Sequence, residues 1–423
     1  MLKIKLEPGE NYEKQLTTFS SNLSKLFQDG KDSGILKILV YPSLDGIIAG
    51  LLMFNIAINL NVKPSFKITN LPPHKISDPT ILIGFSNLNY NVSDINSFLL
   101  AISNKIDSIP ISNSTYIEVD GSIGSSIYFG LKYSNIIPMK PEYAIISLAS
   151  SYSSKYVDSS GKFHSLDYIL LNILNKDNNL KLEMLTGLKL FRPLTMDFCH
   201  SSSITLNPLY LTFTDEDICR KQLKEANLDK ALQNPIIKLD ENTIKELTVM
   251  VLNQLKKYSR KEIEITDYVG GIESSSANLV LEDPREVMTV INSLIETIGV
   301  ESALAMIADY ENEYPQVIKY LKSNVEKASE IILSNKFVRV KSVNFAKVYV
   351  LEEDNLPLSP VANSLRSLGY IEKDALVCKS NDSILSIPAI QLEQIFGYNS
   401  INNFLQSLKG EFKDGFINIK ISS

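Results

Sequence analysis

Apolar runs of strand length alternate with helical patterns through residues 35–150 of the chain. "GILKILVY" precedes "DGIIAGLLMFNIAINL", "PTILIGFS" precedes "VSDINSFLLAISNKI", and "STYIEVDG" precedes "GSSIYFGLKYSN". Strands that alternate with helices predict parallel βαβ units in a doubly wound sheet, so the expected fold class is α/β. Such sheets bind ligands at the carboxyl ends of their strands. The turns to inspect are therefore residues 41–46, 84–87, 112–124 and 150–158.

The rest of the chain predicts two further parts. Residues 165–200 have a helical pattern, and "LDENTIKELTVMVLNQLKKYS" repeats apolar residues at spacings of three and four behind Asp240, its expected N-cap. A helix is expected from Pro284, then another over "YPQVIKYLKSNVEKASEIILSN", followed mainly by strands. Because 423 residues exceed a single core, we expect an N-terminal domain over 1–200, a helical connector over 201–275 and a smaller α/β domain over 276–423.

Composition narrows the possible functions. A net charge of −6 excludes a uniformly basic nucleic-acid binder but not a local basic channel, and nearly all positive charge is lysine, which suits non-specific phosphate contact. Cys199, Cys219 and Cys378 lack metal-ligand spacing and predict buried free thiols in a reducing cytosol. The chain start has no signal-peptide core, and the longest apolar run falls short of the ~20 residues that span a bilayer. We expect a soluble, intracellular protein without a membrane partner.

Catalytic side chains are scarce at the predicted sheet end. The histidines His74, His164 and His200 do not follow predicted strands, and no nucleophile elbow, Walker A loop, dinucleotide-binding turn or zinc-protease helix occurs. Two-metal hydrolysis needs several converging carboxylates and imidazoles. The sheet-end turns offer at most one carboxylate each, namely Asp45, Asp120 and Asp158.

The segment "GSIGSS" at residues 121–126 leaves two interpretations open. Its backbone N–H groups could bind an anion at the start of a helix. Alternatively, its serines could satisfy those amides themselves and cap the helix.

The order of these turns resembles the DHH phosphoesterases, in particular RecJ and the GINS-associated nuclease GAN. In that family the first strand ends in H-x-D-x-D-G, and Tyr41-Pro-Ser43-Leu-Asp45-Gly46 stands there in this sequence. The resemblance places Phe85 or Ser86 at the second motif, Ser112-Asn113-Ser114 at the Asp-His-His motif, and Ser150-Ser151, after a small-residue strand, at the fourth aspartate. It implies that Asp45 alone survives clearly among the metal ligands.

Segments without ligands also resemble that family. "VDGSIGSSIYFGLKY" matches the serine-rich start of a helix, "SSGKFHSLDYILL" and "LKLFRPLT" match segments that close the first domain, and "DPREVMTVINSLIETIG" matches the first helix of the DHHA1 domain. A GGGH substrate loop ends DHHA1 domains, whereas "KGEFKDGFINIKI" keeps Gly410 and Gly415 without a histidine.

The resemblance implies a pseudo-nuclease without a metal or another cofactor. One branch of the family, that of cell division control protein forty-five and its archaeal counterparts, often lacks the metal site and joins GINS and the MCM ring in the replicative CMG helicase. It implies GINS and MCM as partners, a cytoplasmic, nucleoid-associated location, and a lysine-lined cleft that holds single-stranded DNA without cutting it. The candidate DNA-binding residues are Lys140, Lys155, Arg192, Arg366, Lys379 and Lys413.

Two other functions remain open from the sequence. One is an active metal-dependent, single-strand-specific 5′–3′ exonuclease or DHH phosphodiesterase with a rearranged site. The other is an unrelated two-domain α/β protein that binds or converts a small molecule.

Overall fold

A computed structural model gives the structure of the chain. It describes residues 2–86, 92, 94–105, 114–277, 279–343, 346–351, 356–372, 374–379, 384–397, 400–408 and 410–420.

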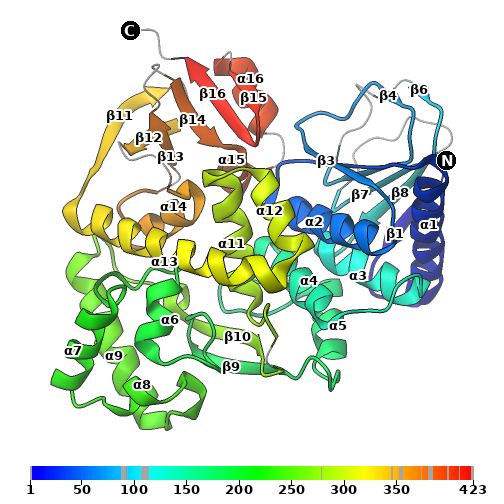
Figure 1. Ribbon diagram of the computed structural model, residues 1–423. Coiled ribbons are helices and arrows are strands. Elements are labelled where there is room, and N and C mark those ends of the chain that lie inside the picture. Colours follow the sequence, from blue (N-terminus) through cyan, green and yellow to red (C-terminus); the bar gives the residue numbers. More distant parts are fainter. Residues whose placement is uncertain are drawn as a thin grey trace.

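The N-terminal part is built on a six-stranded sheet in which every neighbouring pair is parallel, in the order β1-β8-β7-β5-β2-β3. Its strands are β1 (Leu2–Leu6), β2 (Leu36–Val40), β3 (Pro64–Ile68), β5 (Thr80–Ile83), β7 (Leu99–Ser103) and β8 (Ser114–Val119). Its helices are α1 (Tyr12–Ser33), α2 (Leu44–Asn59), α3 (Ile123–Ser134), α4 (Pro141–Ser153) and α5 (Ser165–Leu174). The short strands β4 (Lys75–Ile76) and β6 (Asp94–Ile95) pair beside it. The predicted parallel α/β sheet is confirmed (Figure 1).

Three local predictions in this part are wrong. The helix expected over "VSDINSFLLAISNKI" is the strand β7, whose five residues are all buried. A run that is apolar on both faces does not distinguish a central strand from a buried helix. The small-residue strand that was expected to end at Ser150-Ser151 is the helix α4 (Pro141–Ser153). Of residues 165–200, only α5 and a short later helix are helical, and a strand lies between them.

A small central sheet joins a strand that precedes the predicted connector to the last seven residues of that connector. Strand β9 (Leu182–Leu188) pairs antiparallel with β10 (Val269–Ser275). Between them lie α6 (Phe198–Ile204), η1 (Leu211–Phe213), α7 (Glu216–Glu225), α8 (Lys230–Gln233), η2 (Ile236–Lys238), α9 (Glu241–Tyr258) and α10 (Ile265–Tyr268). The Asp240 side chain accepts a hydrogen bond from Thr243 N at 2.9 Å, which confirms the predicted N-cap of α9. Of the predicted stripe Ile244, Leu247, Val251 and Leu255, the last three are buried and Ile244 is half-buried.

The C-terminal part begins with three helices and ends in a mixed sheet. The helices are α11 (Pro284–Thr297), α12 (Val300–Ala308) and α13 (Tyr310–Ser334), and α11 starts at the predicted residue. The sheet has the order β11-β12-β13-β14-β16-β15. Its strands are β11 (Phe337–Val343), β12 (Ala346–Leu351), β13 (Ala375–Lys379), β14 (Ile384–Pro388), β15 (Glu411–Lys413) and β16 (Phe416–Lys420). Helices α14 (Leu358–Ser367), α15 (Ala389–Phe396) and α16 (Ser400–Leu408) accompany it.

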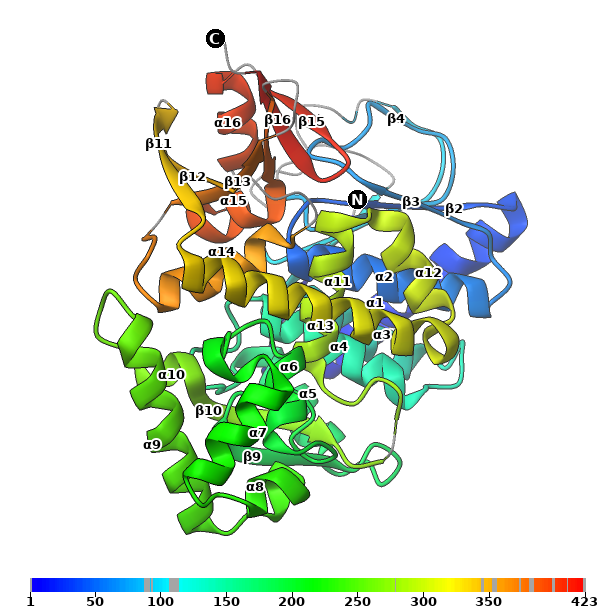
Figure 2. The ribbon, with the colours of Figure 1, turned by 60° about the vertical axis from the view of Figure 1, so that its left-hand side comes forward.

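The three parts share buried surfaces. Helix α11 packs against α4, and α12 packs against α2. One hydrophobic cluster contains Tyr41 and Phe85 of the N-terminal part together with Leu392 and Ile417 of the C-terminal part. Helix α13 runs across the molecule between the central helices and the C-terminal sheet (Figures 1 and 2). The domain limits 1–200, 201–275 and 276–423 stay a prediction.

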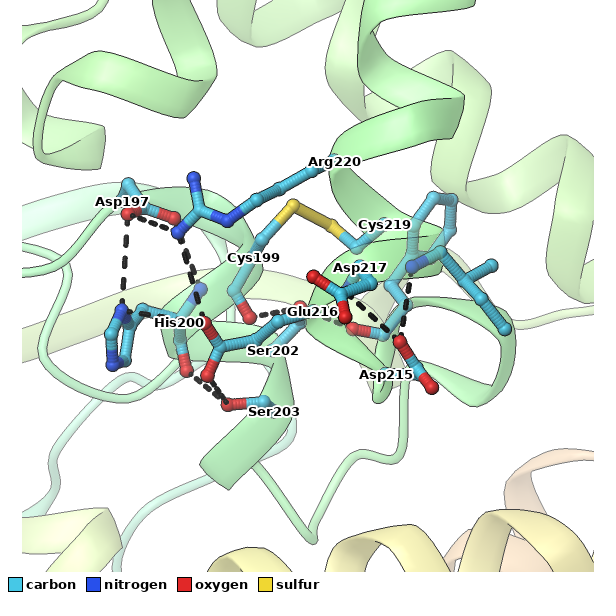
Figure 3. Close-up of a disulfide and its surroundings, with 12 residues drawn as sticks. Asp197, Cys199, His200, Ser202, Ser203, Asp215, Glu216, Asp217, Cys219 and Arg220 are labelled. Atoms are coloured by element: carbon cyan, nitrogen blue, oxygen red, sulfur yellow. Dashed lines mark hydrogen bonds and ion pairs between the residues drawn. A yellow bond between two sulfur atoms is a disulfide. The ribbon is translucent and has the colours of Figure 1, made fainter.

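Two of the three cysteines form a disulfide, so the prediction of free thiols is wrong for them. Cys199 of α6 and Cys219 of α7 are bonded, with their Cα atoms 5.7 Å apart and both side chains fully buried. Figure 3 shows the bond beside Arg220, whose guanidinium lies 3.2 Å from Asp197 and 3.7 Å from Glu216. The packing of α6 on α7 brings together residues that are 20 apart in sequence. The cytosolic location inferred from free thiols loses that support.

Among the described residues, no helix combines the length and the apolar character that crossing a membrane requires.

Candidate functional site at the carboxyl end of the sheet

The turn after β2 provides a core residue and a helix cap. Tyr41 is fully buried, and its ring meets Phe85 edge-on at 5.8 Å between centroids. Ser43 is the N-cap of α2 and accepts a hydrogen bond from Gly46 N at 3.2 Å. A Cβ on residue 46 would lie 2.8 Å from Ser43 Oγ, so the cap requires glycine there. Tyr41 and Ser43 therefore serve packing and capping at the predicted remnant positions.

Asp45 reaches from the first turn of α2 to the start of α3. It is 5% exposed, and both carboxylate oxygens lie 3.1 Å from Ile123 N. Ser150 Oγ of α4 donates a further hydrogen bond to it. Burial raises the pKa of Asp45 to about 7, although the hydrogen bonds from Ser150 and Ile123 oppose that shift. The positive end of the α3 dipole favours a carboxylate here, so Asp45 caps α3.

Asp167 is a second buried carboxylate at the same helix start. It accepts hydrogen bonds from Ser122 N at 2.7 Å, from Ser122 Oγ and Ser125 Oγ at 2.6 Å, and from Ser151 Oγ. We call this set the serine cluster: Asp45, Ser122, Ser125, Ser150, Ser151 and Asp167. Asp167 was not predicted from the sequence, because it lies in α5 and no residue spacing connects it to the motif around Asp45. The serine-rich start of α3 was the available signal.

The backbone amides at the start of α3 are occupied by protein groups. Asp167 and Asp45 accept from Ser122 N and Ile123 N, while Ser150 Oγ accepts from Gly124 N at 3.0 Å. Ser122 Oγ accepts from Ser125 N at 3.2 Å. The capped-helix interpretation of "GSIGSS" is therefore confirmed, and the anion-binding interpretation is wrong.

Ser86, from the second motif, lines the same cleft as Asp45, whereas Ser114, the described residue of the predicted Asp-His-His counterpart, lies away from it. Ser114 begins β8 and pairs with Leu99, so it lies at the amino end of the sheet, opposite the site. The assignment of residues 112–114 to the Asp-His-His motif stays a prediction. Ser112 and Asn113 lie outside the described residues.

The carboxylates at the sheet end do not fit a dinuclear metal site. Asp158 sits in an exposed turn, where hydrogen bonds from Ser160 Oγ and Lys162 N hold its pKa well below the usual range. Asp120 follows β8, and its carboxyl group interacts with the phenol of Tyr156. Within the described ranges, no group of three histidine, cysteine, aspartate or glutamate side chains could hold a metal ion. The donor set is hydroxyl-rich, whereas two-metal hydrolysis needs several carboxylates and imidazoles.

A cleft of about 520 Å³ opens beside the serine cluster. Its lining comes from the ends of β2, β5, β7 and α4 and from α15: Ser43, Asp45, Gly84, Ser86, Ser103, Asn104, Lys105, Ser153, Ser154, Lys155, Tyr156, Glu393 and Gln394. Among the predicted DNA-binding residues whose side chains the structure describes, Lys155 lines this cleft. Lys105 and Glu393 were not predicted, because neither belongs to a recognisable motif.

The two arginines among the predicted DNA-binding residues, Arg192 and Arg366, form hydrogen bonds within the protein. Arg192 donates to both carboxylate oxygens of Glu286 at 2.8–3.0 Å and to Val280 O at 3.2 Å. Arg366 donates to Asn363 Oδ1 and to two backbone carbonyls.

The three other lysines lie elsewhere. Lys140 precedes α4 and lies 3.3 Å from Asn59 Oδ1, and Lys413 is exposed at the end of β15. Lys379 ends β13, and its side chain is outside the description. For these residues DNA binding stays a prediction.

Comparison with known proteins gives a match to structures but not to sequences. No protein-family model and no curated protein matches the sequence. CDC45 from Entamoeba histolytica matches 99% of this chain and 96% of its own, with a TM-score of 0.56 and 11% identity. RecJ in complex with Mn²⁺ from Thermus thermophilus gives 96% and 52% coverage, a TM-score of 0.41 and 9% identity. The structure of exonuclease RecJ bound to manganese matches 96% of this chain and 90% of its own, with a TM-score of 0.42 and 9% identity.

Proposed function

From the fold that this chain shares with CDC45, we propose that it is a non-catalytic, RecJ-like replication factor. It acts as a subunit of an archaeal replicative helicase, binds GINS and MCM, and holds single-stranded DNA in the cleft at the sheet end. Its location is cytoplasmic and nucleoid-associated.

The serine cluster is the observation that carries this proposal. A metal-dependent nuclease activates water by lowering its pKa on a bound cation. Here both oxygens of Asp45 accept from Ile123 N, Ser150 Oγ donates to Asp45, and Ser151 Oγ donates to Asp167. Asp45, the carboxylate that remains at a motif position, thus stabilises the start of α3 together with Asp167, and the described residues keep the scaffold without the donor set for catalysis.

The cleft supports the DNA-binding part of the proposal. Hydroxyl groups, amides and two lysines line it. Lys155 forms no ion pair within the described part of the chain, and its ammonium lies 5.4 Å from the centroid of the Tyr156 ring. A cation beside an aromatic ring suits contact with phosphate and with a stacked base.

Co-purification tests the proposed assembly. The tagged full-length protein, recovered from extract of its own source, should carry GINS and MCM subunits that mass spectrometry identifies. Recovery of a tightly bound metabolite without GINS would instead support the small-molecule alternative.

A nuclease assay tests the absence of catalysis. The protein should leave a 5′-labelled single strand intact in manganese. Asp45→Asn is the matched variant, because asparagine keeps an acceptor for Ile123 N. Manganese-dependent degradation that this variant loses while remaining folded would contradict the proposal and establish the exonuclease.

A further inference from the structure

Glu393 is a half-buried carboxylate on the wall of the cleft that α15 contributes. No hydrogen bond or ion pair within the described residues engages its side chain. Burial raises the pKa of Glu393 to about 7, and no neighbouring charge or donor offsets that effect. A partly buried acceptor of this kind gains from a ligand that brings hydrogen-bond donors. A bare phosphate brings none.

The position of Glu393 is fixed by its helix. The neighbouring Gln391 is fully buried, and its side-chain amide donates to Leu376 O of β13 at 3.0 Å. Leu392 is buried in the core that also contains Tyr41. Because both neighbours anchor α15, the Glu393 side chain faces the cleft from a rigid element, as a selective contact requires.

The cleft is lined by both positively and negatively charged side chains. Lys105 and Lys155 come from the segments after β7 and α4, Asp45 is held by the serine cluster, and Glu393 comes from α15. A nucleotide has the complementary pattern, since its phosphate suits a lysine and its base edge carries N–H donors. The cleft volume of about 520 Å³ lies within the usual range of ligand pockets.

Guanine fits an ionised carboxylate best among the four bases. Its Watson–Crick edge presents N1–H and N2–H side by side, so both carboxylate oxygens can accept. Adenine and cytosine present one amino group, and thymine presents a single N–H between two carbonyl oxygens that repel a carboxylate. Single strands expose these edges for reading.

We propose that Glu393 selects guanine in the single strand that the cleft holds, with Lys155 on the adjoining phosphate. This inference rests on the proposed DNA-binding role and adds a base preference to it. Glu393 is thus a specificity-determining residue at a site whose motif residues cap helices.

Fluorescence anisotropy with labelled twelve-residue oligonucleotides tests the inference. The probes are oligothymidylate and alternating thymidylate strands that carry guanine, cytosine or adenine at every second position. Discrimination by a bidentate base contact predicts about tenfold tighter binding of the guanine strand than of oligothymidylate. In Glu393→Gln, which cannot accept at both positions, that ratio should fall to about one, with the thermal midpoint of the variant confirming its fold.

Two further variants serve as controls. Glu246→Gln makes the same charge change on the exposed face of α9 and should keep the wild-type ratio. Lys155→Ala should weaken binding to all four strands alike.

The outcomes separate the two proposals. Equal wild-type affinity for all strands, or a guanine preference that survives Glu393→Gln, overturns the inference and leaves the DNA-binding role intact. Failure to bind any strand overturns both. A protein partner captured by the wild type but lost in Glu393→Gln, without any oligonucleotide binding, would mean that Glu393 accepts from a basic side chain and also overturns the inference.

Discussion

Two buried polar clusters stand at the starts of two helices, and they stabilise their carboxylates by different means. In the serine cluster at α3, Asp45 and Asp167 accept from backbone amides and hydroxyls alone. At the start of α11, Asp283 pairs with Arg285 at 2.6 Å and Glu286 pairs with Arg192 at 2.8 Å. We call these last four residues the ion-pair cluster.

The two clusters differ in whether arginines accompany the buried carboxylates. Helix-start amides and hydroxyls suffice for the carboxylates beside the cleft, so no arginine is needed there. Arg192, which follows β9, instead pairs with Glu286 of α11, and Arg285 of α11 donates to Leu190 O, so both arginines join segments that are far apart in sequence. The cations described at the sheet-end site are therefore lysines, which suit non-specific phosphate contact.

Arg192→Met should show the largest effect, because it leaves Glu286 buried without its cation. Glu286 is fully buried and otherwise accepts from Tyr314 Oη at 2.6 Å. Removal of one partner from a buried pair costs about 3–5 kcal/mol, and urea unfolding measures this loss. The double variant Arg192→Met/Glu286→Gln should recover part of it, since no buried charge is then left unpaired. An equal or larger loss in the double variant would show that packing of the Arg192 side chain, rather than its charge, matters at this cluster.

Loss of the central disulfide should come next. The bond closes a loop between residues 20 apart, and the chain-entropy account gives about 3 kcal/mol for a loop of this size. Cys199→Ala should lower the free energy of unfolding by that amount, whereas Cys378→Ala, at a cysteine outside any disulfide, should cost less. Alkylation of all three thiols in protein purified without reductant would contradict the disulfide itself.

Gly124→Ala tests how closely the serine cluster is packed. A Cβ at this residue would overlap with the Ser150 side chain, forcing α3 and α4 apart. Such overpacking costs roughly 2–3 kcal/mol, measured by urea unfolding. Gly187→Ala is the matched control, because no atom lies within 4 Å of the position of its Cβ. If the two variants unfold alike, close approach of the helices does not stabilise the cluster.

The sequence predicted those features that local patterns determine. The parallel sheet, the Asp240 cap of α9 and the start of α11 at Pro284 each follow from residues close together in the chain. Strand β7 was predicted as a helix and helix α4 as a strand. Both are continuous apolar or small-residue runs that are buried on all sides, so they lack the periodicity that distinguishes a helix from a strand.

The site depended on contacts that no local pattern encodes. Asp45 was recognisable as the surviving acid of a motif, but its partners Ile123 and Ser150 come from α3 and α4. Asp167 and the Cys199–Cys219 bond likewise arise from packing between helices. Burial of Glu393 in the cleft also depends on how the C-terminal part meets the sheet end.

Asp45→Asn should change stability least, with a sign that depends on pH. Burial raises the pKa of Asp45 from 3.8 to about 7, so between these values the unfolded chain releases a proton that the folded protein keeps. The contribution of Asp45 to stability is therefore full below about pH 4 and is lost as the pH rises toward 7. Asparagine does not ionise, so urea unfolding at pH 5 and pH 7 should show the variant gaining roughly 2 kcal/mol relative to wild type, at ~1.4 kcal/mol per pH unit.

Asp78→Asn is the control for that pH shift, since the Lys37 ammonium and the Ser77 hydroxyl hold the pKa of Asp78 below its usual range. Asp78 is ionised in both states across this window, so its variant should differ from wild type by the same amount at both pH values. A pH-independent difference for Asp45→Asn would mean that the amides and hydroxyls at the start of α3 fully compensate the buried charge. The serine cluster would then stabilise its carboxylates as effectively as the arginines do at α11.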